Sequence, residues 1–227
     1  LVAFYGERAE KLKPAERAAA EARLGLDQPI LRQYALWLKG ALRGEFGISY
    51  KYKMDVLEVI RARLPFTLRL GGIGFLLTFF LALGLGVLCA RHEDKGLDRA
   101  LCKIGTVTSC IPEFWMSLML ILIFAVSLRV LPSSGAYDVG KADDLGSRIT
   151  HLILPLTVVV LGHLWYYAYM VRNKMPEEMR MDYVLLAKSK GLGRKKILYR
   201  HCLRNVLPSY LSIMAISVPH VLGGTYI

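Results

Sequence analysis

Long blocks of apolar residues, separated by short charged segments, dominate this chain from about residue 66 onward. A helix needs ~20 apolar residues to cross the hydrocarbon core of a bilayer. Blocks that meet this length cover residues 66–90, 104–131, 149–171 and 206–227. The apolar residues surround each helix rather than forming one stripe, as in a helix that is buried or embedded in lipid. We therefore expect an all-α membrane protein, a polytopic bundle of transmembrane helices.

The charged residues between the blocks predict how the bundle is oriented. Segments 91–103 and 172–205 carry four and ten Lys or Arg residues, whereas 132–148 carries two. Short cytoplasmic loops have an excess of basic residues, so the first two segments are predicted to be cytoplasmic and the third to lie outside. The net charge of +12 is concentrated between apolar blocks. This placement favours contact with membrane lipid and argues against a nucleic-acid partner.

Residues 1–65 are polar and are predicted to form an extracytoplasmic helical segment, ahead of a permease-like domain at 66–227. Residues 7–23 are rich in good helix formers. After Pro29, apolar residues return at helical spacing, namely Leu31, Tyr34, Leu38 and Leu42. Gly44 and Gly47 are expected to end this second helix. The segment could dock a partner or cap the outer mouth of the bundle, and capping is the simpler use.

Segment 172–205 has the pattern of a helix, a glycine break and a basic helix that runs from 194 to 205. Pro176 and Asp182 predict a helix start, and Gly191 and Gly193 predict its end. Ala187 and Gly191 lie four residues apart, so we expect them to share a face that another protein can approach closely. A rigid projection of this kind suits the transmission of motion from a soluble partner. The alternative is a basic loop held against anionic lipid headgroups.

The order and spacing of residues in this segment are more specific than its charge. The residues concerned are Asp182, Tyr183, Val184, Ala187, Lys188, Lys190, Gly191, Leu192, Ile197, His201 and Asn205. They resemble the EAA loop of permease subunits of binding-protein-dependent ABC importers, in the form of the dipeptide, oligopeptide and nickel subfamily (B-type peptide permeases). The resemblance implies a coupling helix that sits in a groove of a separate ATPase subunit. Leu185 and Leu186 stand where the family usually has polar or small residues.

Further motifs follow in that family's order along nearly the whole chain, at residues 24–29, 46–49, 58–67, 111–115, 131–135 and 151–155. The resemblance implies a bundle of the ABC type I importer kind in the bacterial cytoplasmic (inner) membrane. Such a subunit forms half of a translocation pathway for peptides, or for nickel or another small solute. The implied partners are a second homologous permease subunit, two ATP-binding cassette ATPase subunits and an extracellular or periplasmic solute-binding protein. The family's first and last helices are missing, so we expect a chain truncated at both ends.

Motifs for catalysis or for phosphate binding are not found. The chain has no G-x-x-x-x-G-K-[ST] loop to hold ATP phosphates. We therefore expect no enzyme and no bound cofactor, with ATP and Mg²⁺ used by the partner subunits. An intramembrane enzyme and an uncoupled channel or scaffold are the alternatives from other classes, although Ser109 and Ser117 lack G-x-S-x-G surroundings.

Metal-binding residues are present without the spacing that a metal site needs. His151, His163 and His220 raise the possibility of nickel but show no ligand spacing. No two cysteines have the C-x2-C spacing of a zinc site, and we expect each to pack as a small apolar residue: Cys89, Cys102, Cys110 and Cys202. No metal site is predicted.

Pro112 and Glu113, in the second apolar block, are candidate pathway or gate residues. Proline removes a hydrogen bond from the helical ladder, so we expect a kink that could act as a gate hinge. A carboxylate within a membrane is costly unless it faces water or a partner, and an interfacial or packing role is the alternative for Glu113. The glycines of the first block are expected to let helices pack closely: Gly71, Gly72, Gly74, Gly84 and Gly86.

Overall fold

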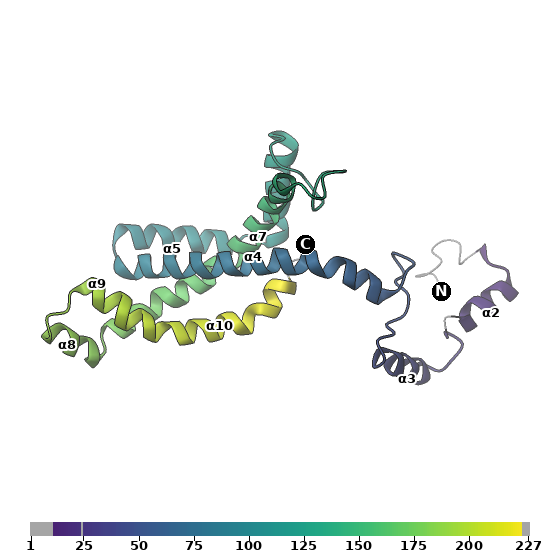
Figure 1. The fold of residues 1–227 in the computed structure, drawn as a ribbon, viewed down its shortest axis with the longest axis horizontal. Helices are drawn as coiled ribbons and strands as arrows, with labels where there is room; N and C mark the ends of the chain where they lie inside the picture. The colour runs from purple at the N-terminus through teal and green to yellow at the C-terminus, as the bar shows by residue number, and fades with distance from the viewer. Residues whose placement is uncertain (1–10, 24, 224–227) are drawn as a thin grey trace. The chain divides into compact units, whose positions relative to one another are not determined.

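The structure is a computed structural model that describes residues 11–23 and 25–223, with residues 1–10, 24 and 224–227 outside the described part. The chain divides into two compact units, residues 1–65 and 66–227. The described residues form helices and one isolated β-bridge between Ile48 and Asp55. The predicted all-α architecture is confirmed (Figure 1).

The first unit contains α2 (Pro14–Arg23) and α3 (Ile30–Ala41). Proline suits the first helical turn because its missing N–H has no helical partner there, and α2 begins at Pro14. The helix predicted from residue 7 begins in residues outside the described part. The predicted helix after Pro29 is confirmed as α3. Gly44 follows it with a φ of +87°, as expected for a glycine that ends a helix.

Two described helices are long and apolar enough to cross a membrane, namely α4 (Val56–Arg91) and α7 (Leu145–Met179). Each contains a predicted span but is longer than it. Pro65 lies inside α4 rather than ahead of it. The carboxylate of Asp144 caps α7 by accepting hydrogen bonds from the amides of Gly146 and Ser147, at 3.0 and 3.3 Å.

The second predicted span, 104–131, is divided into two parts in the structure. Helix α5 (Gly96–Ser109) starts earlier than predicted, and α6 (Glu113–Leu120) continues as a π-helical turn, η2 (Ile121–Ser127). The two parts meet at an angle of 95° and make a third candidate span if they count as one. Proline cannot donate to the helical ladder and disfavours helix at the residue before it. The predicted kink at Pro112 is thus confirmed.

After α7 the chain forms α8 (Asp182–Ser189), α9 (Arg194–Lys196), a second π-helical turn η3 (Ile197–Cys202) and α10 (Leu203–Gly223). The predicted basic helix 194–205 does not stop at Asn205, because α9, η3 and α10 follow one another directly. Pro208 lies inside α10. The fourth predicted span ends in residues outside the described part and stays a prediction.

One buried core joins α4, α7 and α10 to the short helices at the end of α7. Tyr167 and Tyr210 are its largest fully buried side chains. The hydroxyl of Tyr210 donates to the carbonyl of Phe79 on α4, at 2.8 Å. Figure 1 shows α8 and α9 together at one end of α7 and α10. The core therefore extends from the long helices into the segment that connects them.

Glycines of α4 allow α7 to approach it closely. A Cβ atom added at Gly74 would lie 2.9 Å from Val159, and one added at Gly86 would lie 2.5 Å from Val171. The predicted close packing is confirmed for these two positions. At Gly72 and Gly84 an added Cβ would meet no described residue within 4 Å, so close packing is not seen at these two positions within this part of the chain.

Candidate functional site

The segment 180–205, which we call the elbow, has a buried inner side. Val184 and Ala187 of α8 and Ile197 and Cys202 of η3 belong to the same core as the long helices. The elbow therefore packs as an extension of the bundle rather than as a free loop. The expectation that Ala187 faces another protein is wrong, because its side chain is 5% exposed and lies in this core.

The carboxylate of Glu178, at the end of α7, accepts hydrogen bonds from two residues of the elbow. The hydroxyl of Tyr183 donates to Glu178 Oε2 at 2.6 Å, and the amide of Asn205 donates to the same oxygen at 3.3 Å. Burial, and then the hydrogen bond to Glu178, raise the pKa of Tyr183 above its usual range, so this hydroxyl stays a donor. Tyr183 and Asn205 were identified from their motif, whereas Glu178 was not expected to be their common acceptor.

A glycine turn closes α8. Gly191 has a φ of +73°, a left-handed conformation that glycine adopts without steric cost. Its amide donates to the carbonyl of Lys188 at 2.9 Å, and the amide of Leu192 donates to that of Ala187 at 3.2 Å. The predicted glycine break is confirmed. The predicted helix start at Pro176 is wrong, because α7 continues through it to Met179.

The outer side of the elbow combines apolar and basic side chains. Met181, Leu185 and Leu186 are 48%, 59% and 56% exposed. Asp182, Lys188, Lys190 and Gly191 are also exposed, whereas Leu192 and His201 are partly buried. The motif residues thus divide into a buried set that shapes the elbow and an exposed set. The two leucines that depart from the family pattern lie in the exposed set.

Ion pairs tie the segment after α4 to the end of α7. The carboxylate of Asp98 on α5 is nearly inaccessible and receives two hydrogen bonds from Arg172, from Nη2 at 2.8 Å and from Nε at 3.3 Å. The amide of Asp94 donates to Asp98 at 2.9 Å, and Arg180 pairs with Glu93 at 3.3 Å. These pairs connect segments 91–103 and 172–205 at one end of the bundle. Both segments were predicted to be cytoplasmic from their basic residues. Sequence reasoning missed Asp98 and Arg172.

Glu113 opens α6 and packs against α7. Its Oε1 lies 3.9 Å from His163 Nδ1, and a side chain on Gly162 would collide with the carboxyl group. His163 Nδ1 also lies 3.0 Å from the carbonyl of Val159. Glu113 therefore makes a specific contact at the break that follows Pro112. Their pathway or gate role stays a prediction.

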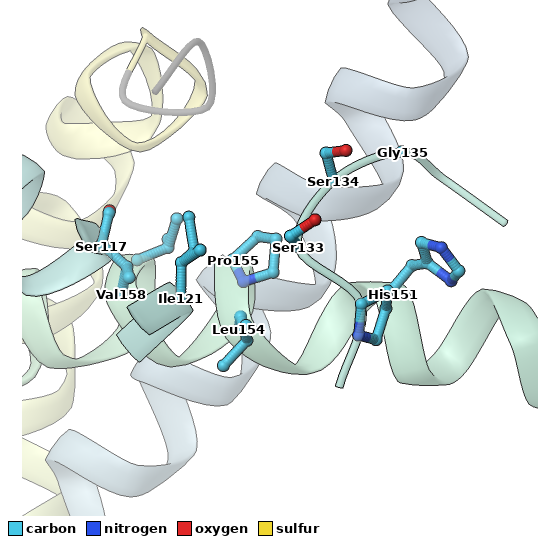
Figure 2. A pocket seen from close by; sticks show the side chains of 11 residues that line it. Ser117, Ile121, Ser133, Ser134, Gly135, His151, Leu154, Pro155 and Val158 are labelled. Carbon is cyan, nitrogen blue, oxygen red and sulfur yellow. The ribbon is translucent and has the colours of Figure 1, made fainter. Parts of the chain in front are cut away.

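A cavity of ≈ 290 Å³ lies at the opposite end of α7 from the elbow. Figure 2 shows α7 residues on one side of it and the segment around Ser133 and Ser134 on another. Residues from two separate sequence motifs, 131–135 and 151–155, lie together in the lining of this cavity. The lining residues are Ser117, Ile121, Pro132, Ser133, Ser134, Gly135, His151, Leu154, Pro155, Val158 and Val159. His151 Nδ1 lies 2.7 Å from the carbonyl of Ser147, which only accepts and so places a proton on this nitrogen.

The described residues contain no group of three or more His, Cys, Asp or Glu side chains arranged to hold a metal ion. Cys89 and Cys202 are buried, as expected of small packing residues, whereas Cys110 is exposed, contrary to that expectation. The side chain of His220 lies outside the described part.

The chain resembles curated permease proteins over most of its length. It is 31% identical over 218 residues to the oligopeptide transport system permease protein AppB of Bacillus subtilis (strain 168), covering 96% of this chain and 69% of that protein. It is 30% identical over 225 residues to OppB of Salmonella typhimurium (strain LT2), covering 99% and 70%. A putative peptide transport system permease protein of Brucella abortus (strain 2308) is 31% identical over 204 residues, covering 90% and 64%.

The family described as binding-protein-dependent transport system inner membrane component matches residues 82–227, which include the elbow, the cavity and the break at Pro112. The long apolar helices agree with a multi-pass protein of the inner membrane. This chain belongs to the family of inner membrane components of binding-protein-dependent transport systems.

Proposed function

We propose that this chain is the permease subunit of an ATP-driven peptide importer and that its elbow transmits the motion of a separate ATPase. The relatives named for oligopeptide transport support peptides as the cargo class. A second homologous permease subunit supplies the other half of the pathway. Two ATPase subunits use ATP and Mg²⁺, and a solute-binding protein outside the membrane delivers the cargo.

The division of the elbow into a buried and an exposed side carries this proposal. Burying a Leu or Met side chain is worth about 1.5–3 kcal/mol. Met181, Leu185 and Leu186 expose enough apolar surface for a docking contact. The exposed lysines and arginines around them favour an acidic surface on the partner.

The contacts inside the elbow support a route by which a docking contact becomes motion of the spans. Glu178 joins α7, α8 and α10, and Arg172 joins α7 to α5. A displacement of α8 therefore carries these helices with it. Transport requires two arrangements of the spans, and the ATPase selects between them only through contacts that differ in the two states.

The test is Leu186→Asp, which places a charge in the exposed apolar set without touching the core. We expect at least a tenfold loss of ATPase subunits that co-purify with the permease, and a matching loss of peptide uptake in proteoliposomes. Leu145→Asp is the matched control, because Leu145 is 70% exposed at the other end of α7. Full co-purification and uptake with Leu186→Asp would show that the ATPase does not dock here.

A further inference from the structure

Helix α3 presents an apolar face that the described residues of its unit do not cover. No residue of α3 is buried. Ile30 and Leu31 are 82% and 83% exposed, and Tyr34 and Trp37 are more than half exposed, with ring centroids 6.1 Å apart. Together with Leu38 and Leu42 they recur at the three- and four-residue spacing that places side chains on one face of a helix.

The charged side chains of this helix are all positive. Between Ile30 and Gly44 the chain has the cations Arg32, Lys39 and Arg43 and no acidic residue. A helix with large apolar residues, Trp and Tyr on one face and only cations among its charges has the composition of helices that lie in a membrane interface. The aromatic rings suit the headgroup level, where one end is apolar and the other wet.

We propose that α3 lies flat on the outer surface of the membrane, with its apolar face in the headgroup and acyl-chain boundary and its cations on the phosphates of anionic phospholipid. The same chain supplies the tether. Fourteen residues, 42–55, separate α3 from α4, and the apolar block of α4 begins at Phe66. A segment so close in sequence to a membrane span meets the surface at high effective concentration. The choice of the outer leaflet follows the orientation predicted from the loop charges.

Helix α2 provides an internal comparison. It mixes charges of both signs, and Arg17 pairs with Glu21 at 3.1 Å. Its apolar residues are alanines, which bury little area in a membrane. The two helices lie in the same unit and have similar lengths. Of the two, only α3 has an apolar face with aromatic side chains and only basic residues among its charged side chains. The proposal therefore predicts that a membrane distinguishes α3 from α2.

The first experiment measures the depth of Trp37 in the full chain reconstituted in lipid nanodiscs. Trp115→Phe and Trp165→Phe leave Trp37 as the reporter. Phospholipid brominated near the headgroup end of its acyl chains should quench Trp37 by at least half, and more strongly than lipid brominated further down. Ala18→Trp in a chain with Trp37→Phe, Trp115→Phe and Trp165→Phe reports α2, since Ala18 is exposed, and should respond to aqueous iodide instead. Trp37 behaving like the Ala18 reporter would overturn the proposal.

The second experiment keeps all tryptophans and so avoids any loss of fold from replacing the buried Trp165. A photoreactive benzophenone side chain at Leu31 should form adducts with phospholipid, whereas one at Ala18 should not. Adducts of Leu31 only with a transporter subunit or the solute-binding protein would mean that a protein covers this face, and would overturn the proposal. The triple variant Arg32→Gln, Lys39→Gln, Arg43→Gln should abolish the preference of the Leu31 adducts for anionic over zwitterionic lipid. An unchanged preference would refute the role of the cations.

Discussion

The contact of α4 with α7 at Gly86 makes a sharp prediction about stability. A Cβ atom at this position would lie 2.5 Å from Val171 Cβ and 2.7 Å from the backbone carbonyl oxygen of Ala168. Ordinary contacts begin at 3.4 Å. The carbonyl belongs to the backbone of α7 and cannot rotate away, so Gly86→Ala must push the two helices apart by several tenths of an ångström.

The size of the effect follows from a comparison with Gly84→Ala. Both glycines lie in the interior of α4, and replacing either with alanine gains about 1 kcal/mol of helix propensity. An added Cβ at Gly84 meets no described residue within 4 Å, so this variant receives the gain alone. Overpacking at Gly86 costs about 1–3 kcal/mol. Gly86→Ala should therefore be less stable than Gly84→Ala by about 1–3 kcal/mol.

The measurement is the thermal midpoint of each variant in one detergent, followed by size-exclusion of the protein that stays folded. For a unit of 150–250 residues, 1 kcal/mol corresponds to roughly 2–4 °C. Gly86→Ala should therefore unfold about 2–12 °C below Gly84→Ala. Equal midpoints for the two variants would refute the close approach of α4 and α7 at Gly86.

Two further predictions concern the contacts at the elbow end. Asp98→Asn removes the buried carboxylate that pairs with the partly buried Arg172 and leaves only the exposed Asp94 as its charge partner. It should destabilise the protein on the order of 2–3 kcal/mol in thermal unfolding. Asp94→Asn, at a side chain 79% exposed, should change stability by less than about 1 kcal/mol. Equal effects of the two variants would contradict the assignment of Asp98 as the main partner of Arg172. Tyr183→Phe removes one hydrogen bond to Glu178, worth about 1.5–3 kcal/mol, and should speed tryptic cleavage of α8 and lower peptide uptake per ATP hydrolysed. Tyr199→Phe, at an exposed hydroxyl 3.4 Å from Arg91, is the control. Identical digestion of the two variants would show that the hydrogen bond to Glu178 does not make the elbow rigid.

Local patterns predicted the parts of this fold that depend on nearby residues. Apolar blocks identified the long helices, Pro112 the break and Gly191 the turn, because each effect acts within one or two helical turns. The end of α7 was misplaced for the opposite reason. Met175 and Pro176 are both buried, and this tertiary packing prevails over the tendency of proline to begin a new helix.

The sequence could not predict which residues of the elbow are buried and which are exposed. A small residue such as Ala187 suits close packing against its own chain or against another protein, and only the position of η3 and α7 decides between them. Asp98 and Arg172 lie 74 residues apart, so nothing in the local pattern pairs them. The convergence of 131–135 and 151–155 on one cavity likewise depends on the direction that the chain takes after η2.

The uninterrupted course of α7 has a mechanical consequence. Leu154 lines the cavity and Glu178 holds the elbow, and the two lie on one helix. At 1.5 Å per residue they are about 36 Å apart. If a rigid helical segment of this length tilts by about 10° around its midpoint, its two ends move by about 3 Å each, in opposite directions. A modest tilt of α7 would thus be enough to reshape the cavity at its far end, without any change in the length of the helix.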